Sequence, residues 1–403
     1  MELKPGYKWT EVGIIPNDWN VSSFKERFRI CAGGDVNPAL SVVEQDEAHP
    51  YPIYSNAITN RGLYGYCSYA DHPACSITIT ARGKLGAAAY RDHSYTAIGR
   101  VLVLEPRQEA SGQFFTEFIN SRIQFAVEST GVPQLTAPQI GHYLLPVPPY
   151  HEQCAIAAAL SDVDALLDGL DRLIAKKREL KQAVMQQLLT GQTRLPGFSA
   201  EWVARPLCNV GDIKSGGTPN TTQSRFWDGG VPWCTPTDVT ALRGRKYLTS
   251  TARTISKAGL QSSSAEIIPP RSLIATSRAT IGECAINLVP VTTNQGFKNI
   301  VTFAETDVEF LYYLMTTQKT RLVALCAGST FPEIGKEQFG DYMITLPRDR
   351  GEQEAIAIIL SDMDAEIASL EARRDKTRDL KRAMMQELLT GKTRLVKPEV
   401  AHA

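Results

Sequence analysis

The sequence lacks the features that mark a membrane protein, a zinc site or a secreted disulfide scaffold. Nowhere in its 403 residues do about 18 apolar residues follow one another, which argues against a membrane-spanning helix. The segment from Met1 to Trp19 contains charges and prolines and has no apolar core, so we expect no signal peptide. The eight cysteines include no C-x-x-C pair, and Cys67 and Cys75 lack the spacing of a zinc knuckle. These absences favour a cytoplasmic protein with reduced cysteines.

The sequence also lacks the excess of basic residues that contact with phosphate usually leaves. Lysine and arginine together number 43, as do aspartate and glutamate, so the formal net charge is zero. Residues 1–150 hold 12 basic and 14 acidic side chains, whereas residues 196–350 hold 16 and 13. Composition alone therefore does not indicate a nucleic-acid partner.

Catalytic motifs are absent or incomplete. The six histidines show neither metal-ligand spacing nor a pairing with a nucleophile. Residues 147–150, Val-Pro-Pro-Tyr, lack the polar first residue of the amino-methyltransferase loop. Residues 391–393, Gly-Lys-Thr, resemble the end of a phosphate-binding loop, but Gln386 stands where such a loop has glycine. We therefore expect no catalytic centre, and neither a metal nor a cofactor bound by this chain itself.

What the sequence does contain is an internal repeat with an offset of 200 residues. Residues 151–195 and 351–395 align without a gap, and 25 of the 45 aligned positions are identical. Each copy begins with Glu-Gln-x-Ala-Ile-Ala and ends near Leu-Leu-Thr-Gly. Apolar residues recur at steps of three and four, which predicts one long coiled-coil helix per copy. The residues predicted for the coiled-coil and subunit interface are Ile156, Leu160, Val163, Leu167, Leu170, Leu180, Leu188, Ile356, Leu360, Met363, Ile367, Leu370, Leu380 and Leu388.

The placement of charge predicts that the two helices pair antiparallel. The first half of each copy is acidic, as at Asp164 and Asp364, and the second half is basic, as at Lys181 and Lys381. Antiparallel packing sets acidic starts against basic ends, whereas parallel packing would bring like charges together. The alternative, two separate solvated helices, would leave the apolar seam exposed.

The remaining two segments also resemble each other, although more faintly. Residues 80–86 resemble 276–282, and residues 139–143 resemble 338–342. Strand-like runs at 76–80, 101–104 and 273–276 accompany amphipathic helices predicted at 114–130 and 308–326. The predicted fold is two α/β (α+β) domains in a pseudo-twofold repeat, joined by two long antiparallel coiled-coil helices. The predicted order is a domain at 1–150, a helix at 151–195, a domain at 196–350, a helix at 351–395 and a tail at 396–403.

These motifs, in this order and duplicated, resemble the specificity subunits of type I restriction-modification enzymes over essentially the whole chain. In the first domain, Cys31–Asp35 departs from the Gly-Gly-Thr-Pro motif that the second domain has at 216–219. The segments that carry the resemblance are the opening Gly6–Trp19, the two repeated helices, Ser215–Pro219 with Val231–Trp233, Ser277–Gly282 and Thr293–Lys298.

The resemblance implies a non-catalytic subunit whose two target-recognition domains each read one half of a bipartite double-stranded DNA target. It also implies that the helices set the gap between the halves and dock two modification subunits, which methylate adenine with S-adenosylmethionine. Restriction subunits that use ATP and Mg²⁺ are implied as further partners. A helix of about 38 residues spans roughly 57 Å. That is long enough to hold two readers about one DNA turn, roughly 34–36 Å, apart.

The candidate DNA-binding residues are basic and amide side chains beside glycines or predicted strand ends. Arginine can read guanine with two hydrogen bonds, and asparagine and glutamine suit adenine, while local packing or surface solvation is the alternative for each. Two other functions stay open: a scaffold with two ligand-binding globules, and an autonomous DNA methyltransferase or nuclease. The candidates are Arg61, Arg82, Lys84, Lys214, Arg225, Arg245, Lys246, Arg278, Asn294, Gln295 and Lys298.

Overall fold

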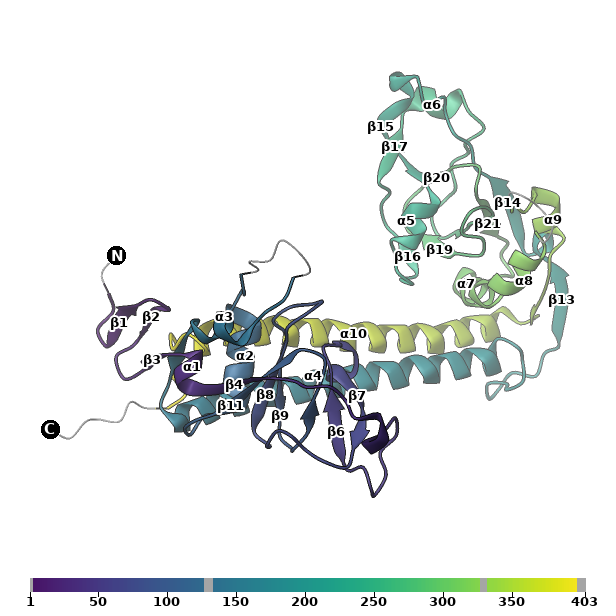
Figure 1. The fold of residues 1–403 in the computed structure, drawn as a ribbon. Coiled ribbons are helices and arrows are strands. Elements are labelled where there is room, and N and C mark those ends of the chain that lie inside the picture. Colours follow the sequence, from purple (N-terminus) through teal and green to yellow (C-terminus); the bar gives the residue numbers. More distant parts are fainter. Residues whose placement is uncertain (1–2, 127–132, 327–331, 397–403) are drawn as a thin grey trace. The chain divides into compact units, whose positions relative to one another are not determined.

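The computed structural model describes residues 3–126, 133–326 and 332–396. Its contacts divide the chain into two compact units. The first unit combines the chain up to Asp171 with the chain from Ala372 onward, and the second is Arg172–Glu371. Each unit contains an α/β domain and one half of each long helix, α4 (Tyr150–Leu188) and α10 (Arg350–Leu388) (Figure 1).

The domain of the first unit is built on two four-stranded sheets. One has the strand order β4-β11-β8-β9 with antiparallel neighbours, and its strand β8 is buried along its whole length. The other has the order β10-β6-β7-β5, in which β10 and β6 are parallel. The strands are β4 (Phe28–Ala32), β5 (Ser41–Val42), β6 (Tyr51–Tyr54), β7 (Leu63–Cys67), β8 (Ser76–Thr80), β9 (Ala88–Arg91), β10 (Thr96–Ala97) and β11 (Val101–Pro106).

Helix α2 (Gly112–Arg122) buries three phenylalanines against the first sheet. It starts where the Ser111 side chain accepts a hydrogen bond from the Phe114 backbone at 3.3 Å, a common way to begin a helix. The helix predicted at 114–130 thus starts slightly earlier and ends at Arg122, and residues 127–130 lie outside the described part. The other elements are β1 (Tyr7–Thr10) with β2 (Gly13–Pro16), β3 (Asn20–Ser23) with β12 (Leu144–Val147), α1 (Phe24–Arg27) and α3 (Ala137–Gly141).

The domain of the second unit follows the same plan. Its main sheet has the order β14-β21-β18-β19, extended by β16, and its second sheet again contains a parallel pair, β15 with β20. The equivalence of strand order confirms the predicted repeat of the domains. The strands are β13 (Trp202–Pro206), β14 (Gly211–Ser215), β15 (Trp227–Cys234), β16 (Tyr247–Leu248), β17 (Arg253–Ile255), β18 (Leu273–Ala275), β19 (Cys284–Asn287), β20 (Thr292–Thr293), β21 (Lys298–Thr302) and β22 (Met343–Pro347).

The helices of this domain are short. The helix predicted at 308–326 is interrupted at Gln318, which caps the end of α7 and the start of α8. The helices are α5 (Pro236–Thr240), α6 (Lys257–Gln261), α7 (Val308–Thr317), α8 (Lys319–Ala324) and α9 (Lys336–Gly340).

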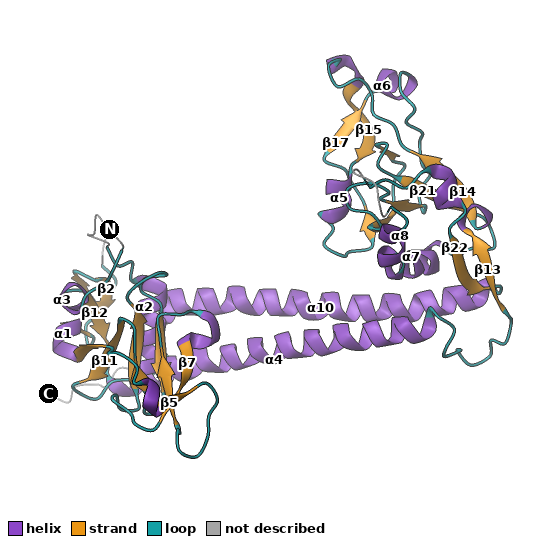
Figure 2. Ribbon diagram, turned by 45° about the vertical axis from the view of Figure 1, so that its right-hand side comes forward, coloured by secondary structure: helices purple, strands orange, loops and turns teal. Residues whose placement is uncertain are grey.

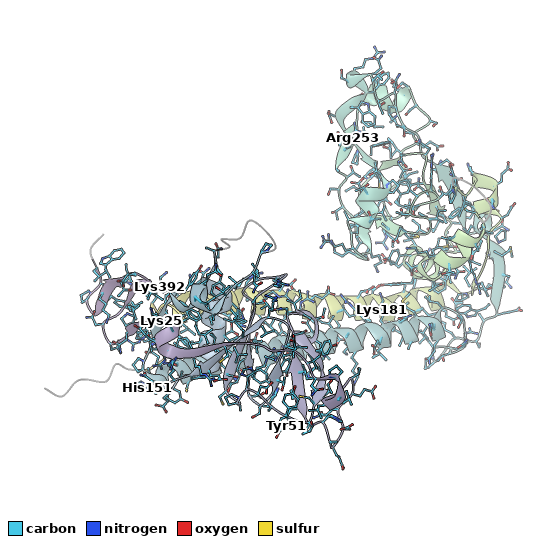
Figure 3. All side chains as sticks on the ribbon, viewed as in Figure 1. Lys25, Tyr51, His151, Lys181, Arg253 and Lys392 are labelled. Carbon is cyan, nitrogen blue, oxygen red and sulfur yellow. The ribbon has the colours of Figure 1, made fainter. Side chains whose placement is uncertain are left out.

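The two long helices run antiparallel, as their charges predict, and each is continuous (Figure 2). In the first unit the Lys381 Nζ lies 2.7 Å from the Asp164 carboxylate. In the second unit the Lys181 Nζ, labelled in Figure 3, lies 2.5 Å from Asp364. Basic ends therefore face acidic starts within each unit.

The residues predicted for the coiled-coil and subunit interface are buried or half-buried at most positions, and two of them lie outside the buried seam. Leu180 is 50% exposed and Leu380 is 55% exposed. The reason is that the next residue in each copy, Lys181 or Lys381, turns toward the other helix to reach its aspartate. Val163, Leu167, Met363 and Leu370 are half-buried. The buried seam residues are Ile156, Leu160, Leu170, Leu188, Ile356, Leu360, Ile367 and Leu388.

The glutamate of each Glu-Gln motif is fully buried and paired with an arginine from the end of the other repeat. Glu152 accepts hydrogen bonds from Trp19 Nε1 at 2.9 Å and from Arg394 Nε at 2.5 Å. Glu352 accepts in the same way from Arg194 Nε at 2.6 Å. A buried carboxylate needs such a partner, which explains why both repeats keep Glu at the start and Thr-Arg-Leu at the end.

The neighbouring glutamine ties each helix to its domain. The backbone N–H of Ser111, at the start of α2, donates to Gln153 Oε1 at 2.9 Å. The N–H of Asp307, at the start of α7, donates to Gln353 Oε1, also at 2.9 Å. Both glutamine amides donate back to a proline carbonyl just before their helix. Each domain is thereby fixed to its half of the helix pair.

Candidate nucleic-acid interface

In the first unit, three loops that follow strands β6, β8 and β10 are held together by one side chain. Asn56 Oδ1 accepts a hydrogen bond from the Ala81 backbone at 2.9 Å, and Asn56 Nδ2 donates to the Gly99 carbonyl. Loops 55–62, 81–87 and 98–100 are therefore neighbours. Their exposed basic side chains are Arg61, Arg82, Lys84 and Arg100.

The turn that carries Arg61 is strained. Asn60, Arg61 and Gly62 all have positive φ angles, of 48°, 50° and 84°, and two of them are not glycine. The buried Arg91 holds the turn from inside, because its Nη2 donates to the Arg61 carbonyl at 2.7 Å and its guanidinium lies 3.4 Å from the Tyr54 ring centroid. Burial lowers the pKa of the Arg91 guanidinium. The Arg61 side chain is thus presented to solvent by a fixed backbone.

Arg82 is supported from across the domain. Its Nε donates to Gln134 Oε1 at 3.2 Å, and Arg100 Nη1 donates to the same oxygen at 3.2 Å. Arg82 and Gln134 also form an isolated antiparallel bridge. The two guanidinium groups are therefore brought together by one amide.

The second unit places loops at the equivalent strand ends, after β15, β18 and β20. The Asn294 N–H donates to the Cys234 carbonyl at 3.1 Å, and the Ser277 N–H donates to the Gly296 carbonyl at 2.8 Å. The Asn294 Oδ1 accepts from the Gly296 N–H at 2.9 Å, so this oxygen serves the turn. The exposed Gln295 interacts with the Thr218 hydroxyl. These contacts bring Arg278, Asn294 and Gln295 to neighbouring loops.

Arg278 faces an acid. Its Nη1 lies 3.8 Å from Glu333 Oε2, and the two residues form an isolated antiparallel bridge. Lys298 Nζ lies 4.0 Å from Glu333 Oε1 and donates to Ser277 Oγ at 3.3 Å. Lys298 is only 5% exposed, and burial lowers its pKa although Glu333 opposes this. Lys298 is therefore buried beneath the loops, where its amine binds Ser277, and this burial argues against a contact with phosphate.

Lys246 has an internal role that the sequence did not reveal. It is 8% exposed, its Nζ lies 2.5 Å from Glu309, and it donates to Ser361 Oγ on α10 at 2.8 Å. This burial argues against Lys246 as a DNA contact. Lys214 is half-buried and paired with Glu266 at 2.8 Å, whereas Arg225 and Arg245 are exposed.

Sequence reasoning missed Arg100, Gln134 and Glu333. The signal that could have found the last two is a short repeat, Pro133-Gln134-Leu135 against Pro332-Glu333-Ile334. It is weak in sequence because three residues carry it. In the structure both copies form an isolated bridge with an arginine, Gln134 with Arg82 and Glu333 with Arg278.

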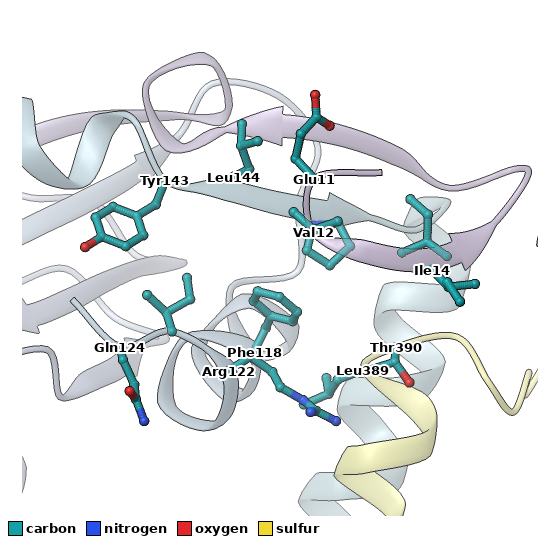
Figure 4. Close-up of a pocket in the computed structure, with 13 residues that line it drawn as sticks. Glu11, Val12, Ile14, Phe118, Arg122, Gln124, Tyr143, Leu144, Leu389 and Thr390 are labelled. Atoms are coloured by element: carbon teal, nitrogen blue, oxygen red, sulfur yellow. The ribbon is translucent and has the colours of Figure 1, made fainter. Parts of the chain in front are cut away.

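A surface pocket of about 470 Å³ lies in the first unit between the β1–β2 hairpin, α2 and the end of α10 (Figure 4). Its apolar lining residues include Ile14, Phe118 and Leu389. Its Arg122 donates to the Gln386 carbonyl at 3.2 Å. Beside these apolar side chains the lining includes Glu11, Gln124 and Tyr143, so the pocket has a mixed polar and apolar surface.

In the part of the chain that the structure describes, no three His, Cys, Asp or Glu residues are grouped so that they could hold a metal ion. Among the same residues, no helix is long and apolar enough to cross a membrane. The eight cysteines are free thiols.

Two equivalent α/β domains, each with neighbouring loops that carry an exposed arginine and each fixed to its half of the antiparallel helix pair, define a protein made of two similar modules. The model of the family described as the type I restriction modification DNA specificity domain matches residues 16–182 and 199–377. The chain therefore belongs to this family, and the resemblance inferred from its motifs is confirmed.

Individual relatives carry the same description. The chain is 34% identical over 175 residues to the MjaIX type I restriction enzyme specificity subunit of Methanocaldococcus jannaschii, which covers 43% of this chain and 40% of that protein. It is 22% identical to the putative MjaX specificity subunit of the same organism, over 96% of this chain and 97% of that protein.

Solved structures share the fold. The S subunit of a type I restriction-modification system from M. genitalium matches with a TM-score of 0.62 at 14% identity, covering 96% of this chain and 98% of that one. A chain from a structure of type I system assembly and conformational transition matches with a TM-score of 0.57 at 18% identity, covering 94% and 99%. At these identities the likeness concerns the fold alone, and it confirms the predicted architecture.

Proposed function

We propose that this chain reads DNA sequence for a type I restriction-modification complex in the cytoplasm, with each α/β domain reading one half of a bipartite double-stranded target. The observation that carries the proposal is the equivalence of the two loop clusters. In each domain an exposed arginine follows a buried strand, Arg82 after β8 and Arg278 after β18. Arginine beside a strand end can reach guanine O6 and N7 or a phosphate.

The zero net charge is compatible with this function because many charges are used internally. Basic side chains of the helix pair, such as Lys177 and Lys381, face acidic ones of the other helix. On the loops of the first domain the exposed charges Arg61, Arg82, Lys84 and Arg100 are basic, whereas in the second domain Arg278 faces Glu333. We propose that partner subunits supply part of the phosphate contact, which makes DNA affinity of the chain alone modest and salt-dependent.

We propose that the helix pair docks two modification subunits. Leu173 and Leu180 of the second unit are 40% and 50% exposed and lie seven residues apart along α4. Residues seven apart lie on one face of a helix, so these leucines form an apolar stripe that the seam does not use. In this proposal the modification subunits bring S-adenosylmethionine, restriction subunits bring ATP and Mg²⁺, and this chain performs no catalysis and binds none of these cofactors.

The test is to map methylated adenines after expressing this chain with its modification subunit in a host without adenine methylation. A single split motif, with two short halves around a constant gap, is expected. Exchanging residues 20–145 for the corresponding segment of another specificity subunit is expected to change one half only. A complex that forms but methylates no motif would favour the scaffold function instead. Methyl transfer or cleavage by the purified chain alone would favour an autonomous enzyme.

A further inference from the structure

In both domains the same position of the fold faces the arginine of the recognition loops. It is Gln134 in the first domain and Glu333 in the second. Each forms an isolated antiparallel bridge with its arginine, Arg82 or Arg278. In the first domain the Leu135 N–H donates to the Ala81 carbonyl at 2.9 Å. In the second domain the Ile334 N–H donates to the Ser277 carbonyl at 3.0 Å. The backbone frame of the two sites is therefore the same.

The side chains at this position differ in charge and in hydrogen-bonding capacity. The Gln134 oxygen accepts from Arg82 and Arg100, and its amide also has an NH₂ group that can donate. Glu333 can only accept, and its oxygens lie 3.8 Å from Arg278 and 4.0 Å from Lys298. Both distances exceed a hydrogen bond, so these two cations orient the carboxylate without occupying its lone pairs.

A carboxylate at this place is unfavourable for contact with phosphate. The Glu333 side chain is 41% exposed beside Arg278, which is 48% exposed, so the acid lies at the surface of the recognition loops. It repels the DNA backbone and removes part of the positive charge of its neighbours. Such a group becomes favourable when it accepts a hydrogen bond from a base, and the exocyclic amino group of cytosine is the usual donor to Glu or Asp in the major groove.

We propose that Gln134 and Glu333 are specificity-determining residues, one for each half of the target, and that Glu333 accepts a hydrogen bond from the exocyclic amino group of a base. The inference rests on the proposed function. Arg278 and Lys298 attract the carboxylate without a hydrogen bond, and Arg278 remains exposed for a neighbouring base or phosphate. The Gln134 amide can both donate and accept hydrogen bonds, so the first domain has a different base preference although its backbone frame is the same.

The experiment compares Glu333→Gln with Glu337→Gln in complex with the modification subunit. Glu337 is an exposed acid four residues along on α9, so both variants remove one exposed negative charge from the second domain. Methylated motifs are mapped, and binding is measured on duplexes substituted at each position of the target, at two salt concentrations. The expected result for Glu333→Gln is a loss of discrimination of about tenfold or more at one base pair of the half assigned to the second domain. The other half is unchanged.

Glu337→Gln is expected to keep the whole motif. Gln134→Glu is expected to change the first domain's half and to leave the second intact, which provides a test should Glu333→Gln fail to fold. The inference is overturned if Glu333→Gln and Glu337→Gln keep full discrimination at every position and raise the affinity for all DNA equally, because only charge would then matter. A wild-type complex that methylates no split motif removes the proposed function and this inference with it. If the wild-type complex methylates a split motif and the Glu333→Gln and Gln134→Glu complexes methylate the same motif, the inference is overturned while the proposed function stands.

Discussion

Arg394 is the counter-charge of a carboxylate that has no access to water, and its removal should destabilise the first unit. Glu152 is 0% exposed and accepts from Arg394 Nε at 2.5 Å and Nη2 at 2.7 Å. In Arg394→Leu the carboxylate keeps only the hydrogen bond from Trp19 Nε1. The substitution leaves a buried charge without its pair.

The size of the loss in unfolding free energy follows from the burial of this ion pair. Removing one partner of a buried pair costs about 3–5 kcal/mol. The Arg394 side chain is 15% exposed, so some water can approach, and we expect the lower end, about 3 kcal/mol. The matched control is Arg374→Leu on α10, which also removes an arginine from the first unit. Its partner Asp171 is 54% exposed at 3.4 Å, so we expect a loss below about 1 kcal/mol.

The assay is native-state hydrogen exchange of the full chain, because it reports the stability of each unit separately. Arg394→Leu should lower the protection of the β8 and β11 amides in the first unit. Arg194→Leu should do the same for β18 and β21, because Arg194 pairs with Glu352 in the second unit. The double variant Arg394→Leu/Glu152→Gln should recover at least about 1 kcal/mol, since it removes the unpaired charge. Wild-type protection of β8 in Arg394→Leu would refute this account of the Glu152 pair.

Three further predictions concern the helix pair, a glycine and acid stability. Leu173→Glu should leave stability within about 0.5 kcal/mol but prevent co-elution with the modification subunit, whereas Leu160→Ala in the buried seam should cost about 2–5 kcal/mol by denaturant unfolding. Retained co-elution would remove the exposed stripe as a docking surface. Gly216→Ala should lower Tm strongly, since an added Cβ would lie 1.9 Å from the Asn294 carbonyl oxygen, while Gly34→Ala meets nothing within 4 Å and should be neutral. Burial raises the pKa of Asp18, but the hydrogen bond and charge of Arg394 outweigh this and lower it overall. Stability from this pair should therefore be full above about pH 4 and decline as the pH falls through the lowered pKa. In Asp18→Asn the unfolding free energy should depend less on pH below about pH 4, and an unchanged slope would contradict the role given to Arg394.

Patterns within one segment predicted the fold well. The steps of Ile156 and Leu160 and the charges of Asp164 and Lys381 lie along the helices themselves, so sequence spacing was enough for the buried seam and the antiparallel pairing. Leu180 lies outside the buried seam because Lys181, one residue on, takes the inward position, where its stem packs while its amine reaches Asp364.

The candidate site was harder to predict because it is made by tertiary contacts. Lys246 belongs to a basic cluster in sequence, but the fold buries it against Glu309. Gln134 is separated from Arg82 by 52 residues, and no local pattern links them. The charge of a side chain can be read from the sequence, whereas its burial and its pairing with a distant segment of the same domain depend on how the strands are ordered.

The two units differ in how their residues are ordered along the chain. The second unit is one continuous stretch, Arg172–Glu371, whereas the first combines the beginning of the chain with its end. During synthesis on the ribosome, which proceeds from the N-terminus, the second unit is complete once Glu371 has emerged. The first must wait for Leu388 and Arg394, and until then Glu152 has no counter-charge and its apolar seam has no partner. The domain that is translated first is therefore the one that finishes folding last, and premature termination near the 3′ end of the message would destabilise the α/β domain encoded at its 5′ end.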